Sequence, residues 1–96
     1  MSRRVRVRLE AELDVAAAAR WYETQRAGLG IDYIDEISRT LSSLAYNALR
    51  NPEIIDGVRR VLTRRFPYSI TYRIVGDEVV VLSVLHMSRE PPVRTR

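Results

Sequence analysis

The chain has no cysteine, no lysine and a single histidine among its 96 residues. Without cysteine it can form neither a disulfide nor a thiolate metal site, a composition that fits the reducing cytoplasm. Its charged N-terminus lacks the apolar segment of a secretory signal, and no apolar run approaches the ~18 residues that a membrane-spanning helix needs. We therefore expect one cytoplasmic domain over residues 1–96, with no membrane segment, cofactor or metal.

Charge is distributed unevenly along the chain, and all 16 basic side chains are arginines. Residues 1–9 carry four arginines and no acid, residues 10–36 carry seven acids against two arginines, and residues 57–96 carry eight arginines against three acids. This asymmetry indicates an anionic partner, either nucleic acid or an acidic polypeptide, because arginine binds phosphate and carboxylate in a bidentate way. A genomic bias toward arginine codons explains the absence of lysine equally well.

Strand signals dominate residues 58–89. Apolar side chains recur at every second position of one segment, which is the period of a strand with one buried face: Tyr68, Ile70, Tyr72 and Ile74. Gly76 and Asp77 predict a two-residue hairpin turn, since glycine tolerates the positive φ that such turns need. The nearly unbroken apolar residues 79–85 then predict a central strand covered on both faces. Residues 4–9 alternate as well, and predict a first strand whose inward side chains are Val5, Val7 and Leu9.

The period becomes helical in residues 11–27. Leu13, Ala17 and Trp21 lie four residues apart and predict an apolar stripe, so that Trp21 is expected in the core rather than on the surface. Gly28 or Gly30 is expected to end this helix.

A second helix follows at once, with Asp32 as its predicted N-cap. Its apolar residues recur at intervals of three and four, until Asn51 and Pro52 stop it. Residues 53–57 are expected to form a loop, and residues 90–96 an irregular basic tail. The predicted fold is α+β with the order β-α-α-β-β-β: a helical hairpin packed on a mostly antiparallel four-stranded sheet.

The strand-rich half also carries the candidate binding residues, which are all arginines: Arg59, Arg60, Arg64, Arg65, Arg73 and Arg89. Such a set can clamp phosphates or carboxylates, or it can form a solvated face paired with the acids of the helices. His86, at the end of the last strand, can act as a general acid or base or as a structural hydrogen-bonding residue. Cleavage of RNA without a metal also needs a second proton-transfer group, for which the candidates are Tyr68, Tyr72 or a carboxylate.

Three runs of the sequence together resemble a known group of proteins: WYETQRAGLG, VRRVLTRRFPYSITYRI and VVVLSVLHMSREP. They are similar to the RelE/ParE superfamily of toxins from bacterial type II toxin–antitoxin (plasmid stabilisation) modules, and the similarity spans residues 5–91. The resemblance implies a β-α-α-β-β-β fold, in agreement with the periodicities above. It also implies that this protein is a toxin that inhibits growth.

The branches of this superfamily differ in their targets. RelE-like members cut mRNA in the ribosomal A site, whereas ParE-like members poison DNA gyrase and lack the catalytic set. Ser69 stands where RelE carries an arginine, and no aromatic residue follows Arg89, and both departures favour the ParE-like branch. A ribosome-dependent mRNA endoribonuclease is the alternative, and the resemblance implies Arg65, His86 and Arg89 as its catalytic residues.

The resemblance further implies a cognate antitoxin whose C-terminal segment wraps the toxin. An acidic, amphipathic segment fits the charge distribution, because it would neutralise the arginines and bury apolar residues along the helices or a sheet edge. Toxin and antitoxin would then form a hetero-oligomer.

Overall fold

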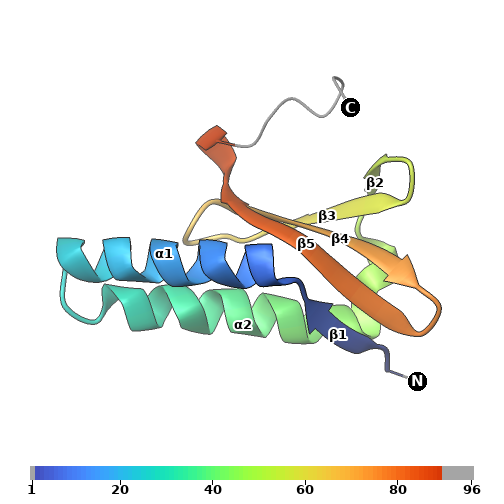
Figure 1. Cartoon of the computed structure of the whole chain (residues 1–96), viewed down its shortest axis with the longest axis horizontal. Coiled ribbons are helices and arrows are strands. Elements are labelled where there is room, and N and C mark those ends of the chain that lie inside the picture. Colours follow the sequence, from blue (N-terminus) through green and yellow to red (C-terminus); the bar gives the residue numbers. More distant parts are fainter. Residues whose placement is uncertain (1, 90–96) are drawn as a thin grey trace.

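A computed structural model describes residues 2–89, with the backbone alone at Arg89 (Figure 1). Two helices form one layer and a sheet forms the other, in the predicted order of elements with one strand added. The elements are β1 (Arg4–Val7), α1 (Leu9–Gln25), α2 (Leu29–Asn47), η1 (Ala48–Arg50), β2 (Glu53–Ile55), β3 (Val58–Leu62), β4 (Tyr68–Val75), β5 (Glu78–His86) and η2 (Met87–Arg89). The predicted basic tail, residues 90–96, lies outside the described residues. Within the described part, no helix combines the length and the apolar character needed to cross a bilayer.

The sheet has five strands in the order β1-β5-β4-β3-β2, so the predicted number of four is wrong. β1 pairs with β5 in parallel, and the other neighbouring strands pair antiparallel. The prediction of a mostly antiparallel sheet is therefore confirmed. The strand that was missed is β2, which is 3 residues long and lies in the segment expected to be a loop. So short a strand cannot display an alternation. It forms because the chain turns back onto β3 at Gly57, where φ is 70°.

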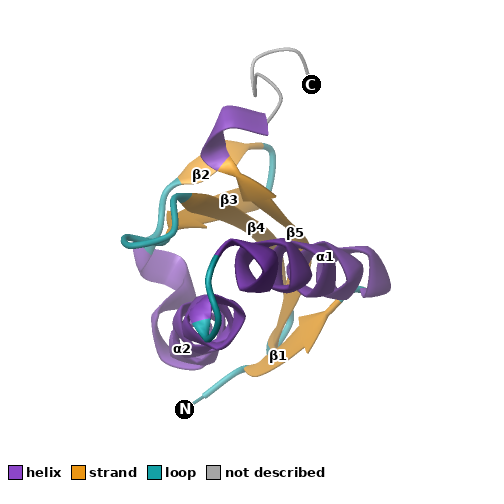
Figure 2. Cartoon of the chain, turned by 90° about the vertical axis from the view of Figure 1, so that its left-hand side faces the viewer, coloured by secondary structure: helices purple, strands orange, loops and turns teal. Residues whose placement is uncertain are grey.

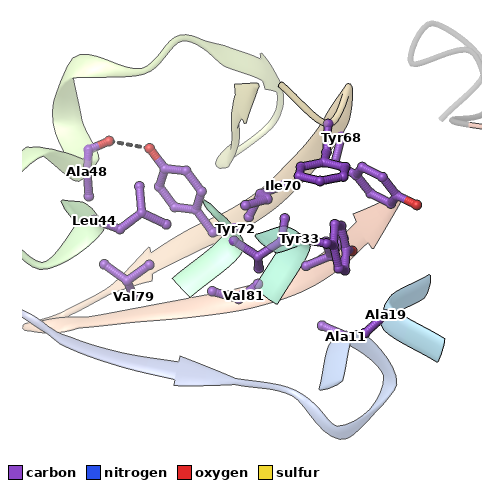
Figure 3. Packing of buried hydrophobic residues seen from close by; sticks show 13 residues of the cluster. Ala11, Ala19, Tyr33, Leu44, Ala48, Tyr68, Ile70, Tyr72, Val79 and Val81 are labelled. Carbon is purple, nitrogen blue, oxygen red and sulfur yellow. Dashed lines mark hydrogen bonds between the residues drawn. The ribbon is translucent and has the colours of Figure 1, made fainter. Parts of the chain in front are cut away.

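Helix α2 supplies the large side chains between the two layers. Tyr33, Ile37 and Leu44 are buried and belong to one cluster with residues of β4 and β5 (Figure 3). The apolar stripe of this helix recurs at the intervals of three and four read from the sequence, which is why its core side was predictable.

The predicted alternation of β4 is confirmed. Tyr68, Ile70 and Tyr72 are buried, and Ile74 packs against the same cluster. The Tyr72 hydroxyl donates a hydrogen bond of 2.6 Å to the carbonyl of Ala48, so its polar tip is satisfied inside the protein (Figure 3). This bond fastens η1, at the end of the helical layer, to the middle of the sheet.

Helix α1 faces the core with a different side from the predicted one. Its buried residues are the small Ala11 and Ala19, whereas Leu13 and Trp21 are 60% and 58% exposed, so the expected core stripe is wrong. Alanines occur on more than one side of this helix, so spacing alone could not select the side, and the small side chains allow the closer approach to its neighbours. Leu9 is also exposed and starts α1 instead of extending the first strand inward.

Glu23 of α1 closes the helical hairpin. Its carboxylate accepts hydrogen bonds from the backbone N–H groups of Gly28 (2.9 Å) and Gly30 (3.0 Å), and these bonds lower the pKa of the carboxyl. Helix α2 begins at Leu29, directly after Gly28 with its φ of 88°. The predicted N-cap Asp32 is therefore wrong, because Asp32 lies in the first turn and the capping oxygens come from the preceding helix.

We expect Glu23→Gln to destabilise the protein in a pH-dependent way. A carboxyl whose pKa is lower in the folded state contributes stability above its unfolded pKa of about 4.5, and the contribution is lost as the pH falls through the folded pKa. Urea unfolding should therefore show a lower midpoint for the variant at neutral pH, with a smaller difference under strongly acidic conditions. Asp35→Asn, an exposed change on α2, is the control. A loss that does not vary with pH would contradict this role of Glu23.

Gly30→Ala should destabilise the protein although alanine is normally the better helix former. A Cβ at Gly30 would lie 2.6 Å from the Ala19 carbonyl oxygen and 3.0 Å from Glu23 Oε1, so the two helices would have to move apart. We expect a loss of about 1–3 kcal/mol in the free energy of unfolding, measured by urea titration. Ser38→Ala, at an exposed position of the same helix, should change stability by less than ~0.5 kcal/mol. A stabilised Gly30→Ala protein would refute the close contact.

Candidate functional site

The face of the sheet turned away from the helices carries one group of arginines. Cross-strand partners point to the same side, and the pairing register places Arg6, Val80 and Arg73 in a row across β1, β5 and β4. This row faces away from the helices because the neighbours of Arg73 along β4 point into the core. Arg60 lies on the same side of β3, two residues from the partner of Arg73. We call Arg6, Arg60 and Arg73 the arginine face. Its Arg6 forms an exposed ion pair with Glu78 at 3.4 Å.

Arg59 was predicted to belong to the same binding surface but points to the helical side. Its Nη1 donates to the carbonyl of Asn51 at 2.6 Å and to that of Leu49 at 3.4 Å. These carbonyls belong to the chain around η1, so the guanidinium holds the end of the helical layer against the sheet. Alternation along β3 separates Arg59 from Arg60 in this way, since adjacent residues of a strand point to opposite faces.

Arg65 lies in the connection between β3 and β4, and this connection is fastened to α2. The Arg65 backbone N–H donates to Glu36 Oε2 at 2.9 Å, and the N–H of Phe66 points to the same oxygen at 3.4 Å. The Arg65 guanidinium pairs with Asp32 at 3.3 Å and lies over the Phe66 ring, 5.1 Å from its centroid. Two acids on successive turns of α2 therefore hold the loop, and Arg65 contacts α2 instead of the arginine face.

The two remaining predicted arginines are Arg64 and Arg89. Arg64 is exposed, and among residues 2–89 it has no ion-pair partner. Arg89 lies in η2, directly after the last strand, with its side chain outside the described part. The predicted set is therefore divided: Arg60 and Arg73 share a face, and Arg59, Arg64 and Arg65 lie elsewhere.

His86 ends β5, and its ring is held from one side. Nδ1 accepts a hydrogen bond from the backbone N–H of Ser88 at 3.1 Å and lies 2.8 Å from Ser88 Oγ. Because a backbone N–H can only donate, the neutral ring carries its proton on Nε2. The Tyr68 ring packs edge-on against the imidazole at 5.3 Å between centroids. His86 thus forms hydrogen bonds with Ser88 at the end of β5, which fits the structural role considered for it.

A groove of about 480 Å³, the α1–β5 groove, lies between α1 and the end of β5. Ala17, Trp21 and Tyr22 line it from α1, and Val84 and His86 line it from β5. In Figure 2 helix α1 lies beside β5. Two residues of the stripe that sequence periodicity assigned to the core, Ala17 and Trp21, therefore line a groove at the surface.

Two of the proposed proton-transfer groups lie together, because Tyr68 and His86 both line the α1–β5 groove. Arg65 packs on Phe66 beside α2, whereas His86 packs on Tyr68 in the α1–β5 groove. The Tyr72 hydroxyl is buried and bonded to a main-chain carbonyl. Burial, reinforced by the nearby tyrosines, raises the pKa of the core phenol Tyr33, so no phenolate base is available there at neutral pH. No cluster of His, Asp and Glu suited to a metal ion occurs within residues 2–89.

The order of elements and the five-stranded mixed sheet are those of the RelE/ParE superfamily of toxins. The family model described as "ParE toxin of type II toxin-antitoxin system, parDE" matches residues 5–91, so the chain belongs to the ParE toxin family. A solved structure titled "Chromosomal ParDE TA system from P. aeruginosa" shares the fold with a TM-score of 0.80 at 20% identity, over 88% of this chain and 96% of the other. No curated protein matches the chain. The predicted membership is confirmed.

Sequence reasoning did not select Arg6 as a candidate binding residue, and it placed Trp21 in the core. The alternation of the first strand already put Arg6 on the outer side, but nothing in the sequence signals the parallel pairing that brings it beside β5 and in line with Arg73. The exposure of Trp21 follows from the rotation of α1, which its many alanines conceal.

Glu36 should matter more for stability than Asp32, although both acids hold the same loop. Glu36→Ala leaves two backbone N–H groups without their charged acceptor and should cost about 1–2 kcal/mol. Asp32→Ala removes only an ion pair whose side chains are 55% and 42% exposed, and should cost less than ~1 kcal/mol. Urea midpoints of the two variants test this order. An equal or larger loss for Asp32→Ala would show that the ion pair, rather than the backbone contact, holds the loop.

Proposed function

We propose that this ParE-family toxin inhibits growth by binding DNA gyrase in the cytoplasm, and that an acidic, amphipathic C-terminal segment of its cognate ParD-type antitoxin neutralises it. The family match makes a type II toxin–antitoxin module the setting. The solved relative is titled as a ParDE system, and the same pairing with an antitoxin is the natural expectation for this chain.

The pairing of the Arg65 guanidinium with Asp32 is the observation that favours a binding toxin over a ribonuclease. A metal-independent nuclease must bring a base, an acid and a cation to one phosphate. Here the Arg65 guanidinium is paired with Asp32, and the His86 imidazole packs on Tyr68 in a groove beside α1. Toxicity by binding requires no such convergence, only a complementary surface.

The arginine face is our candidate for the surface that binds the target. It lies on the open side of the sheet, and Arg6 and Arg73 are exposed there. The Arg73 guanidinium donates one hydrogen bond to the Asp56 carbonyl at 3.3 Å, which limits its rotamers without neutralising its charge. A pre-positioned cation loses less side-chain entropy when it pairs with a carboxylate of a partner.

The α1–β5 groove is our candidate for apolar contact with the antitoxin. An amphipathic segment needs an apolar surface to contact as well as partners for its charged side chains. The exposed Leu13 and the groove residue Trp21 offer such an apolar surface along α1. Tryptophans that become buried on binding contribute much of the binding free energy at protein interfaces, and Trp21 is exposed in this chain.

A ribosome-dependent mRNA endoribonuclease is the second candidate, and one observation favours it. His86 lines a groove, and both of its contacts with Ser88 are made by Nδ1, so they leave Nε2 for proton exchange with a substrate. Arg65 and Arg89 would then have to be brought to the same phosphate on the ribosome.

Expression without antitoxin should arrest growth, and the purified toxin should inhibit gyrase supercoiling. Charge reversal of the arginine face with Arg6→Glu and Arg73→Glu should raise the toxin concentration for half-inhibition at least ~10-fold, since the new glutamates would repel acidic groups of the target across the interface. The control pair Arg20→Glu and Arg50→Glu, at exposed positions outside this face, should inhibit like wild type.

His86→Ala separates the two candidate functions. We expect it to retain gyrase inhibition and to leave translated mRNA intact, as wild type does. Codon-position cuts by the wild-type toxin that disappear in His86→Ala and Arg65→Ala, with gyrase unaffected, would establish the ribonuclease instead. Normal growth at good soluble yield without antitoxin would contradict both.

A further inference from the structure

The α1–β5 groove contains a carboxylate without a partner. Asp14 lines the groove and is half-buried, yet within residues 2–89 its side chain makes no hydrogen bond and no ion pair. No arginine of the described part lines the groove, and His86 carries no charge while its Nδ1 accepts the Ser88 N–H. A half-buried charge without a counter-ion loses hydration and gains no pairing energy in return. The groove therefore holds a negative charge that a cationic ligand can balance.

Small residues of α1 leave open space beside this carboxylate. Asp14, Ala17 and Trp21 follow one another at intervals of four and three residues, and all three line the groove from one face of the helix. From Asp14 to Trp21 the helix rises roughly 10.5 Å. The side chains between them on this face belong to Ala17 and Ala18, which are too short to fill that length. The carboxylate and the indole therefore stand at the two ends of one hollow.

Aromatic rings form the other walls of this hollow. The Trp21 and Tyr22 rings lie 5.1 Å apart between centroids and are inclined by 74°, and the Tyr22 and Tyr68 rings lie 6.3 Å apart and are inclined by 60°. Rings at such angles enclose a space instead of forming a flat stack. The face of an aromatic ring carries the negative part of its quadrupole, so several rings around one space attract a cation. The rings and the carboxylate thus favour a ligand of the same sign.

An organic ammonium ion fits these walls better than a metal ion does. A metal ion such as Ca²⁺ needs several oxygen ligands to replace its water, whereas the groove offers one carboxylate, and residues 2–89 contain no group of His, Asp and Glu suited to a metal. An alkylated ammonium ion can contact ring faces through its methyl groups and keep its charge near a carboxylate. The groove volume of about 480 Å³ also lies within the range of ~300–1,000 Å³ that is usual for small-molecule sites.

We propose that the α1–β5 groove binds a small organic ammonium ion as a free ligand. Its charge lies beside Asp14, and its alkyl groups contact the rings of Trp21 and Tyr68. Every group of the site comes from this one chain, so binding does not depend on the antitoxin or on either candidate target. An antitoxin segment that buries Trp21 would displace the ion, because both occupants need the same ring.

Fluorescence of Trp21 tests the site directly, because it is the one tryptophan of the chain. The full chain, refolded from denaturant, is titrated with choline chloride, with dimethylbutanol, which is the neutral carbon isostere of choline, and with sodium chloride as the control for ionic strength. We expect a saturable change of emission with choline. Its half-saturating concentration should be at least ~5-fold lower than that of the isostere, since only choline carries the charge that the rings and the carboxylate attract.

Removal of the carboxylate tests which group holds the charge. Asp14→Asn should raise the dissociation constant for choline at least ~5-fold. The matched control, Glu12→Gln, removes the same charge from an exposed position of the same helix outside the groove, and should bind within ~2-fold of wild type. Trp21→Leu has no reporter, so its choline binding is followed by saturation-transfer NMR on the ligand methyl protons, and it should also weaken at least ~5-fold. Circular dichroism and urea midpoints show whether the variants fold.

Three outcomes would overturn the ammonium site. Equal affinities of the wild type for choline and for its isostere would show a groove that is merely apolar. A choline effect no larger than that of sodium chloride would show no binding at all. Equal losses in Asp14→Asn and Glu12→Gln would remove the role of the groove carboxylate. The comparison of ligands uses the wild type alone, so it decides even where a variant does not fold. None of the readouts involves growth or gyrase, so failure here leaves the proposed function standing.

Discussion

The close approach of α1 and α2 at Ala19 and Gly30 is the constraint on which the arrangement of the helical layer depends. No Cβ fits between the helices at Gly30, and the same proximity lets Glu23 reach the backbone at the start of α2. Small residues of α1 occupy the inner side, so its large apolar residues are left on the outer side. One packing requirement thus accounts for both the rigid hairpin and the surface groove at Trp21.

The arginines fall into two groups, those that bond to partners within the chain and those that stay exposed. Arg59 is bonded to main-chain carbonyls, and Arg65 is paired with an acid of α2, so both contribute to the fold. Arg73 stays exposed on the helix-free face, and Arg39 and Arg64 stay without an acid among the described residues. The uneven charge of the sequence is therefore partly neutralised inside the molecule. The positive charge that is left over is exposed and can serve a partner.

The sequence predicted the elements whose patterns have a single interpretation. The alternation from Tyr68 to Ile74 and the periodic apolar residues of α2 each indicate one buried side, and both predictions are correct. The patterns failed where more than one side was compatible with them, as in the alanine-rich α1, or where too few residues existed to form a pattern, as in β2. The sequence predicted that arginines would form the candidate site, but it did not predict which of them share one surface. Strand neighbours such as Arg59 and Arg60 point to opposite faces. In addition, the pairing between distant strands is not encoded locally.

The parallel pairing of β1 with β5 has a consequence for folding. The first strand bonds within the sheet only to β5, Arg4–Val7 beside Glu78–Val81, so this pair joins two segments that are distant along the chain. Such a contact costs loop-closure entropy before it contributes stability, which makes it intrinsically slow to form. A chain in which this pair is still open lacks the row of Arg6, Val80 and Arg73, so the arginine face exists only after the two distant strands have met.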